Sequence, residues 1–183
     1  FSISPAQTEQ VEAIIEALNQ HSYGWRLKPI ILSHHEVLAP TLTKLREHRG
    51  GRWACLFCKR VMLSKAAEIA EEMGASAIVT GDSLGQVASQ TLSNMEVISY
   101  GIEKPILRPL IGMDKTEIMD LARQIGTYEA SIQDAHSCPF LPDRPLTQAT
   151  VSKLRELLDR MEGAEDGQEP PDAEKNRSSQ RDG

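Results

Sequence analysis

Three cysteines are the side chains best suited to reactive chemistry in this 183-residue sequence. Cys55 and Cys58 form a Cys-x-x-Cys pair, and Cys138 lies about 80 residues further on. So few cysteines, in an odd number, do not make the disulfide framework of a secreted domain, so the pattern favours metal or sulfur chemistry in an intracellular protein. The alternative is that Cys55 or Cys58 is a small buried apolar residue at the start of a helix.

A second group of candidate residues is basic. Residues 44–65 contain seven bases and one acid, a local charge of +6 in a chain whose formal net charge is −6. Such a segment is a candidate binding site for a polyanion. A solvated helix face followed by a loop would have the same composition. The bases are Lys44, Arg46, Arg49, Arg52, Lys59, Arg60 and Lys65.

The third candidate is a turn that follows an apolar run. Residues 76–80 predict a short buried strand, and Gly81 and Asp82 come directly after it. Ligands of open α/β sheets bind at the carboxyl ends of strands, where a glycine lets the backbone approach a bound group closely. Gln90, a few residues later, adds amide hydrogen-bonding groups. On these residues alone, a nucleotide pocket and an ordinary strand-to-helix connection fit equally well.

The elements that must position these residues alternate between helices and strands. Helices are predicted from Pro5 to Leu18, over part of 37–48, from Cys55 to Met73, over 85–93, and from Asp114 to Ile125. Strands or extended segments are predicted at 27–32, 76–80 and 105–110. This order predicts an α/β fold with a doubly wound parallel sheet covered by helices on both sides.

Composition divides the chain into a domain and a tail. Residues 1–161 can supply a core, since 40% of the chain is hydrophobic. Residues 162–183 hold seven acids, three bases and few apolar side chains, which predicts a disordered acidic tail. No apolar run approaches the roughly 18 residues of a membrane span, and no signal peptide opens the chain, so we expect a cytoplasmic protein with no membrane partner. Because the chain begins at Phe1, we also expect an upstream portion to be missing.

Four blocks of sequence carry a resemblance to a known family. They are Cys-Lys-Arg-Val-Met at 58–62, the run at 79–92 around Thr-Gly-Asp-Ser, the run at 106–115 around Arg-Pro-Leu-Ile-Gly-Met-Asp-Lys, and Leu-Ala-Arg-Gln-Ile-Gly-Thr at 121–127. In this order they resemble the ATP-pyrophosphatase domain of the tRNA 4-thiouridine synthetases, or tRNA sulfurtransferases, from Phe1 to about Thr147. Four ordered blocks are far more specific than one motif. The resemblance implies an adenine nucleotide alpha-hydrolase-like (PP-loop) fold.

The resemblance also implies a reaction. ATP, with Mg²⁺, would adenylate a carbonyl oxygen of a tRNA uridine, which is a poor leaving group until it is esterified to AMP. A sulfur donor, either a cysteine desulfurase persulfide or sulfide, would then displace AMP and leave 4-thiouridine, because such sulfur species are strong nucleophiles at neutral pH. The implied partners are tRNA and this donor, and a homodimer is left open.

Site residues follow from the same resemblance. Phe1 matches the end of a strand beside the adenine, and Lys59 matches a basic nucleotide contact. Gly81 and Gln90 match two further ATP-contacting positions. Cys138 matches the cysteine that carries sulfur transfer in members with a fused rhodanese domain.

Two departures from the family pattern lead to further expectations. The phosphate-binding run Ser-Gly-Gly-x-Asp-Ser is absent, so we expect the chain alone to be an inactive fragment. No rhodanese domain follows Cys138, and related enzymes that lack one use three such cysteines to hold an iron–sulfur cluster. We therefore expect Cys55, Cys58 and Cys138 to converge as ligands of a [4Fe-4S] cluster with one open iron site, at a helix start whose amides favour thiolates. The alternative is a Cys-x-x-Cys redox pair with Cys138 as a separate nucleophile.

Other functions remain open at this point. A non-catalytic nucleotide- or RNA-binding module would keep the same pocket without the reaction. A sulfur-transfer enzyme acting toward the thiamin thiazole ring, or a tRNA thiolase acting on another base, would share the same blocks.

Overall fold

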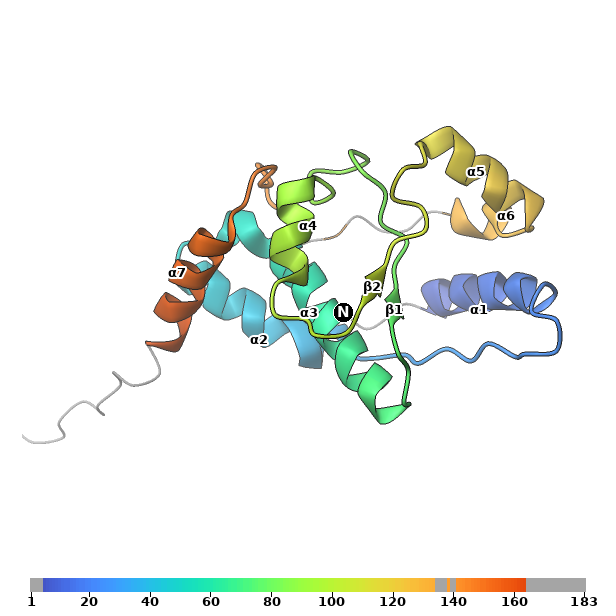
Figure 1. Cartoon of the computed structure of the whole chain (residues 1–183), viewed down its shortest axis with the longest axis horizontal. Helices are drawn as coiled ribbons and strands as arrows, with labels where there is room; N and C mark the ends of the chain where they lie inside the picture. The colour runs from blue at the N-terminus through green and yellow to red at the C-terminus, as the bar shows by residue number, and fades with distance from the viewer. Residues whose placement is uncertain (1–4, 134–137, 139–140, 164–183) are drawn as a thin grey trace, which may run out of the picture.

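The computed structural model of the chain describes residues 5–133, 138 and 141–163, and its elements alternate between helices and short strands (Figure 1). Phe1 and most of the acidic tail lie outside the described residues. In chain order the elements are α1 (Pro5–Asn19), α2 (His34–Glu47), the 3-10 helix η1 (Gly51–Trp53), α3 (Ala54–Glu72), β1 (Ile78–Val79), α4 (Leu92–Ser99), β2 (Ile106–Leu107), α5 (Lys115–Gln124), α6 (Tyr128–Ser131) and α7 (Val151–Glu162).

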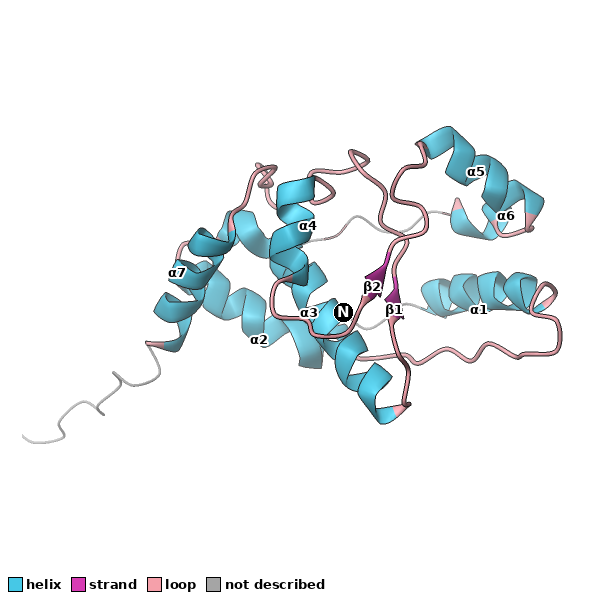
Figure 2. Cartoon of the chain, viewed as in Figure 1, coloured by secondary structure: helices cyan, strands magenta, loops and turns pink. Residues whose placement is uncertain are grey.

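The two described strands form a parallel pair with α4 as the connection between them (Figure 2). Ile78 lies opposite Ile106, and the amide of Thr80 donates to the carbonyl of Leu107 at 3.0 Å. The parallel direction places the ends of both strands at the same edge of the sheet. The residues that follow β1 and β2 are therefore close together.

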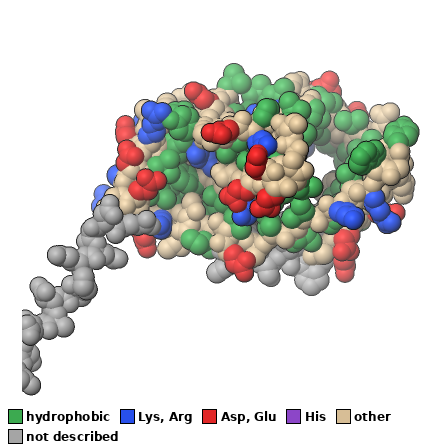
Figure 3. Space-filling model, turned by 60° about the horizontal axis from the view of Figure 1, so that its bottom comes forward, with side chains coloured by type: hydrophobic (Ala, Val, Ile, Leu, Met, Phe, Trp, Pro, Cys, Tyr) green, Lys and Arg blue, Asp and Glu red, His purple; other side chains and the backbone are tan. Residues whose placement is uncertain are grey.

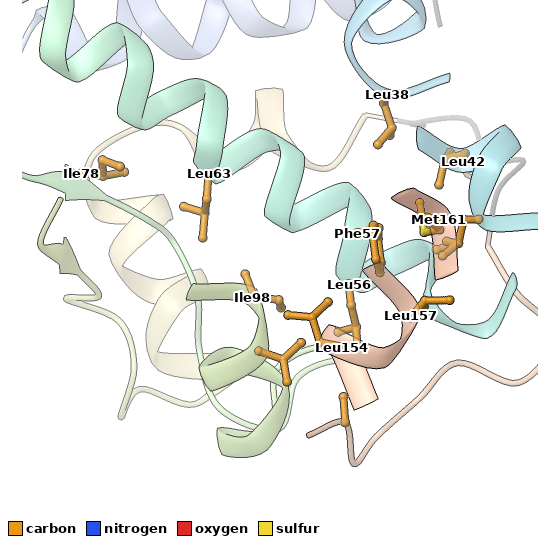
Figure 4. Close-up of a cluster of buried hydrophobic side chains, with 14 of the residues drawn as sticks. Leu38, Leu42, Leu56, Phe57, Leu63, Ile78, Ile98, Leu154, Leu157 and Met161 are labelled. Carbon is orange, nitrogen blue, oxygen red and sulfur yellow. The ribbon is translucent and has the colours of Figure 1, made fainter. Parts of the chain in front are cut away.

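Helix α3 is the centre of the packing. It packs against α2, α4 and β1, and α4 packs in turn against α7. The apolar side chains between these helices are almost completely buried (Figure 4). Removal of this apolar surface from water is the main force that holds α3 in place. The core includes Leu38, Leu42, Leu45, Leu56, Phe57, Leu63, Val97, Ile98, Leu154 and Leu157.

A second group of helices lies beyond the sheet. Helices α1 and α5 both pack against the short α6, on the far side of the strands from α7 (Figure 1). Asp114 caps α5 through a reciprocal pair of hydrogen bonds with Glu117, and Gly126 follows the helix with a φ of 78°. These are the start and stop that the sequence predicts. Neither α5 nor α6 has a buried residue.

Large apolar side chains also reach the surface (Figure 3). Leu27, Ile30, Ile31, Val79 and Leu107 are among those that are exposed. Within the described part of the chain, no helix combines the length and apolar character that crossing a membrane requires.

Two predicted elements are wrong. Residues 27–32 form no strand, because Pro29 has no amide hydrogen and no described strand pairs with the segment. The helix predicted at 85–93 instead begins at Leu92, where the Thr91 hydroxyl accepts a hydrogen bond from the amide of Asn94. Gly85, with a φ of 74°, lies in a turn before it. The remaining predicted helices are present, and the strand at 76–80 is shortened to two residues.

Candidate nucleotide and sulfur-transfer site

Asp82 lies at the centre of a polar cluster at the end of β1. Lys59 Nζ, from the second turn of α3, donates to Asp82 Oδ1 at 2.8 Å, and Thr80 Oγ1 donates to Oδ2 at 2.9 Å. The Lys59 and Asp82 side chains are 26% and 15% exposed, so the ion pair is mostly shielded from water. The pair joins α3 to the ligand-binding edge of the sheet.

Two further side chains complete this group, which we call the Asp82 site. Arg108, just after β2, places Nε 3.5 Å from Asp82 Oδ2 and donates through Nη2 to Ser99 Oγ at 2.7 Å. Gln90 contributes a hydrogen bond to Asp82. Among the described residues, buried Gln90 Oε1 and Arg108 Nε have no hydrogen-bond partner. A bound ligand can therefore form hydrogen bonds with this buried acceptor and this buried donor.

The ionisation of Asp82 reflects competing effects. Burial raises the pKa of Asp82, but hydrogen bonds from Lys59 and Thr80 and the charge of Lys59 outweigh it, and the pKa lies below its usual value. Asp82 is therefore charged at neutral pH. With Lys59 and Arg108 beside it, the site contains two cations and one anion, a balance that favours an anionic ligand.

A cavity of about 260 Å³ adjoins the Asp82 site. Lys59, Thr80 and Asp82 form its polar wall, and apolar side chains of α3, β1 and α4 form the rest. A Cβ atom added at Gly81 would meet no protein atom within 4 Å, so the space in front of this turn is open. The structure thus brings Lys59, Gly81 and Gln90 together around Asp82, as the sequence predicts.

The cysteines form a second group next to this one. Cys55 and Cys58 lie in the first two turns of α3, and Cys58 directly precedes Lys59. Burial raises the pKa of both thiols, and the nearby Cys138 raises it further, while Lys59 lowers it. The expectation that the helix start favours thiolates is therefore wrong here, because burial dominates. Cys55 and Cys58 thus share the start of α3, and Cys138 acts on the pKa of both.

The geometry of the thiols bears on metal binding. Cys55 and Cys58 are partly buried, Cys138 is exposed, and none of them is in a disulfide. Soft thiolates suit iron–sulfur clusters. Nevertheless, no three Cys, His, Asp or Glu side chains among the described residues lie in an arrangement that could hold a metal ion. The present arrangement does not fit a cluster, and we derive no chemical step through one.

Sequence reasoning missed part of the Asp82 site. It assigned no role to Asp82 and did not identify Arg108. The available signal was position, since Asp82 and Arg108 each follow a strand of a predicted parallel sheet, and such ends meet at one edge.

The chain is similar to a protein of known structure and to a known protein family. The described part of the chain resembles a crystal structure of a 4-thiouridine synthetase–RNA complex with bound ATP, with a TM-score of 0.75 and 35% identity over 87% of this chain and 41% of that one. The chain thus has the α/β fold of the PP-loop ATP pyrophosphatases. Residues 2–162 match the family described as "Thiamine biosynthesis protein (ThiI)", and the chain belongs to this family.

Similar full-length proteins are described as probable tRNA sulfurtransferases. The protein of Methanocaldococcus jannaschii is 39% identical over 161 residues, which is 88% of this chain and 42% of that protein. The protein of Thermococcus kodakarensis is 40% identical over 157 residues, or 86% of this chain and 41% of that protein. The chain therefore spans about two fifths of the length of these relatives.

Proposed function

We propose that this chain supplies nucleotide-binding and sulfur-transfer residues of a cytoplasmic tRNA sulfurtransferase that makes 4-thiouridine. The observation that carries the proposal is Lys59, which pairs with Asp82 and directly follows Cys58 in α3, so that one helix start holds both the thiol pair and the cation of the Asp82 site. A reaction that activates a base with ATP and then replaces its oxygen by sulfur needs both groups within reach of one substrate. The relatives described as tRNA sulfurtransferases support this assignment.

In the first step, the uridine O4 attacks the α-phosphorus of ATP, which is bound with Mg²⁺, and pyrophosphate leaves. Lys59 and Arg108 balance the phosphate charge, since cations held in advance stabilise the charge of such a transition state. Gln90 offers its unpaired Oε1 as a hydrogen-bond acceptor for the nucleotide. The open space at Gly81 accommodates the bound group.

In the second step, a cysteine desulfurase persulfide transfers its terminal sulfur to Cys138, the exposed thiol of the three, and the donor leaves as a thiol. The terminal sulfur of the Cys138 persulfide attacks C4 of the adenylated uridine, a C–S bond forms, and AMP leaves with the former uridine oxygen. The thiolate of Cys55 or Cys58 then attacks Cys138 Sγ, which forms a protein disulfide and releases 4-thiouridine. A cellular dithiol reductant restores the thiols.

The persulfide route is tested against a [4Fe-4S] cluster, which the thiols as arranged here do not fit. Anaerobic treatment with iron and sulfide, followed by absorbance and metal analysis, separates the two. Iron uptake that is lost when Cys55 and Cys138 are both changed to Ala would favour the cluster. No iron uptake, with sulfur transfer still lost in Cys138→Ala, would favour the persulfide.

The nucleotide part of the proposal is tested with Lys59→Met. We expect this variant to bind ATP with Mg²⁺ about tenfold more weakly, the loss of roughly one charge-assisted hydrogen bond. Lys65→Met is the matched control, because Lys65 lies on the same helix and pairs with Glu68 on the surface. Equal ATP affinities for the two variants, measured by calorimetry, would contradict an ATP site at Lys59.

The family description raises a second candidate, since it names thiamine biosynthesis. Sulfur transfer toward the thiamin thiazole would use the same thiols without tRNA. In cells that lack the endogenous enzyme, restored 4-thiouridine in tRNA without relief of a thiamine requirement would support the tRNA assignment alone.

A further inference from the structure

A cavity that lies apart from the Asp82 site is lined by arginines. It has a volume of about 680 Å³ and is bounded by the end of α2, by η1 and by residues 141–144. Four arginines and one acid, Asp143, line it, together with apolar groups. All four arginines are exposed to solvent. They are Arg46, Arg49, Arg52 and Arg144.

The structure divides the basic segment 44–65 into two classes. Lys59 pairs with Asp82, Lys65 pairs with Glu68, and Arg60 donates to the carbonyls of Val97 and Tyr100. The side chains of Lys59, Arg60 and Lys65 therefore form contacts within the domain or along α3. Arg49, which follows α2, and Arg52, in η1, line the cavity, where Arg144, distant in sequence, joins them.

The backbone holds Arg49 in an unfavourable conformation. Its φ is 58°, in the left-handed region that favours glycine. The next residue, Gly50, donates to the carbonyl of Leu45 at 2.7 Å, and a Cβ there would lie 2.5 Å from Leu45 Cδ1. A side chain at position 50 would therefore clash with Leu45. At position 49, a glycine would adopt the left-handed φ with less strain than the arginine does. An arginine kept at a strained position is a sign of use in binding.

The cavity is also built to present fixed donors. Arg52 Nε donates to the carbonyl of Arg144 at 3.0 Å, which ties η1 to the loop 141–144. Guanidinium groups suit phosphate because their planar N–H groups pair with two oxygens at once. Among the described lining residues, Arg49, Arg52 and Arg144 outnumber the single acid Asp143, which suits a ligand with more than one phosphate. A chain of phosphodiesters has this chemistry.

The position of the cavity connects it with sulfur transfer. Ala54 lines it, and Cys55 is the next residue of α3. The other wall, residues 141–144, begins three residues after Cys138. Two of the three segments that bound the arginine cavity are thus continuous in sequence with the residues that carry the thiols.

We infer that this arginine cavity binds the sugar–phosphate backbone of the RNA substrate and anchors it beside the three cysteines. The inference rests on the proposed function for the identity of the substrate. An acidic protein, such as a sulfur donor, is the competing occupant. Arginine pairing with several phosphates and the direct continuity with the thiol-bearing segments favour RNA.

The test compares tRNA binding by the full chain and by the double variant Arg49→Gly/Arg144→Gln. Each lost phosphate contact should reduce the slope of log affinity against log salt by about 0.7 to 0.9, which is about five- to eightfold in affinity at roughly 0.1 M KCl. The double variant should therefore bind tRNA some 25- to 60-fold more weakly at that salt concentration, by fluorescence anisotropy. Lys153→Gln, an exposed base on α7 outside the cavity lining, should keep the parent slope.

Folding and function are separated by Arg49→Gly alone. Relief of the left-handed strain should leave its melting temperature equal to or above that of the parent, while tRNA affinity falls. An unchanged salt slope in the double variant would overturn the inference while ATP binding at Lys59 stands. Loss of binding to an acidic sulfur-donor protein with that slope unchanged would assign the cavity to protein and also overturn it. A parent chain that bound no tRNA at low salt would contradict the cavity's role independently of the ATP test.

Discussion

The Asp82 site and the arginine cavity hold their cations in opposite ways. At the Asp82 site, Lys59 and Arg108 surround a carboxylate and are mostly shielded from water. In the arginine cavity, the guanidiniums are exposed and outnumber the one acid. Cations of the first kind also stabilise the fold, because loss of one partner leaves an uncompensated charge. Cations of the second kind face solvent, so we expect their removal to affect ligand binding more than the stability of the fold.

The largest expected effect on stability comes from Asp82→Asn. This change leaves Lys59 and Arg108 without their anion in a shielded position. We expect a loss of about 2 kcal/mol in the free energy of unfolding, less than for a fully buried pair because both side chains retain some exposure. Urea unfolding measures it. Glu68→Gln removes an exposed pair partner on the same helix and should change stability little; equal losses in both variants would contradict the comparison.

A smaller effect is expected from pH. The folded pKa of Asp82 lies below its usual value, so the pair contributes stability above the unfolded pKa of about 3.9 and loses it as pH falls through the folded pKa. The stability difference between the parent and Asp82→Asn should therefore be constant near neutral pH and shrink in acid. Urea unfolding at a series of pH values tests this. A difference that grew on acidification would show that Asp82 is not a charged partner.

The smallest effect on stability is expected from Gly81→Ala. The turn has no left-handed φ at Gly81 and open space at the Cβ position, so the unfolding free energy should stay constant or rise by up to about 1 kcal/mol. ATP affinity should fall, because the methyl group occupies space proposed for the nucleotide. Gly85→Ala is the control: its φ of 74° makes alanine cost about 1 kcal/mol or more without touching that space. Unchanged ATP affinity in Gly81→Ala would remove this turn from the site.

Local signals in the sequence predicted those elements whose ends are set by nearby residues. Helix α5 is the clearest case, since Asp114 and Gly126 mark both ends through contacts within one turn. The ending of α3 near Gly74 is similar, with a φ of 66°. The sheet edge was also predictable, because a parallel order places the residues after β1 and β2 together.

Features that depend on distant residues were not predictable. Residues 27–32 have the composition of a strand, yet a strand exists only where a neighbour pairs with it. The sequence indicated only part of the arginine cavity, because Arg144, whose carbonyl accepts a hydrogen bond from Arg52 Nε, lies 92 positions away from Arg52. Likewise, nothing in the order of residues indicates that burial outweighs the helix start at Cys55 and Cys58.

Helix α3 carries a wall of the arginine cavity at Ala54, two thiols at Cys55 and Cys58, and the cation of the Asp82 site at Lys59. A helix rises about 1.5 Å and turns about 100° per residue, so the geometry of the helix, and not a loop, fixes the distances and directions between these groups. One residue inserted between Ala54 and Lys59 would turn one set of groups away from the other while both remained intact. The spacing from the cavity wall at Ala54, past the thiol pair, to the cation at Lys59 is thus fixed by about one and a half helical turns.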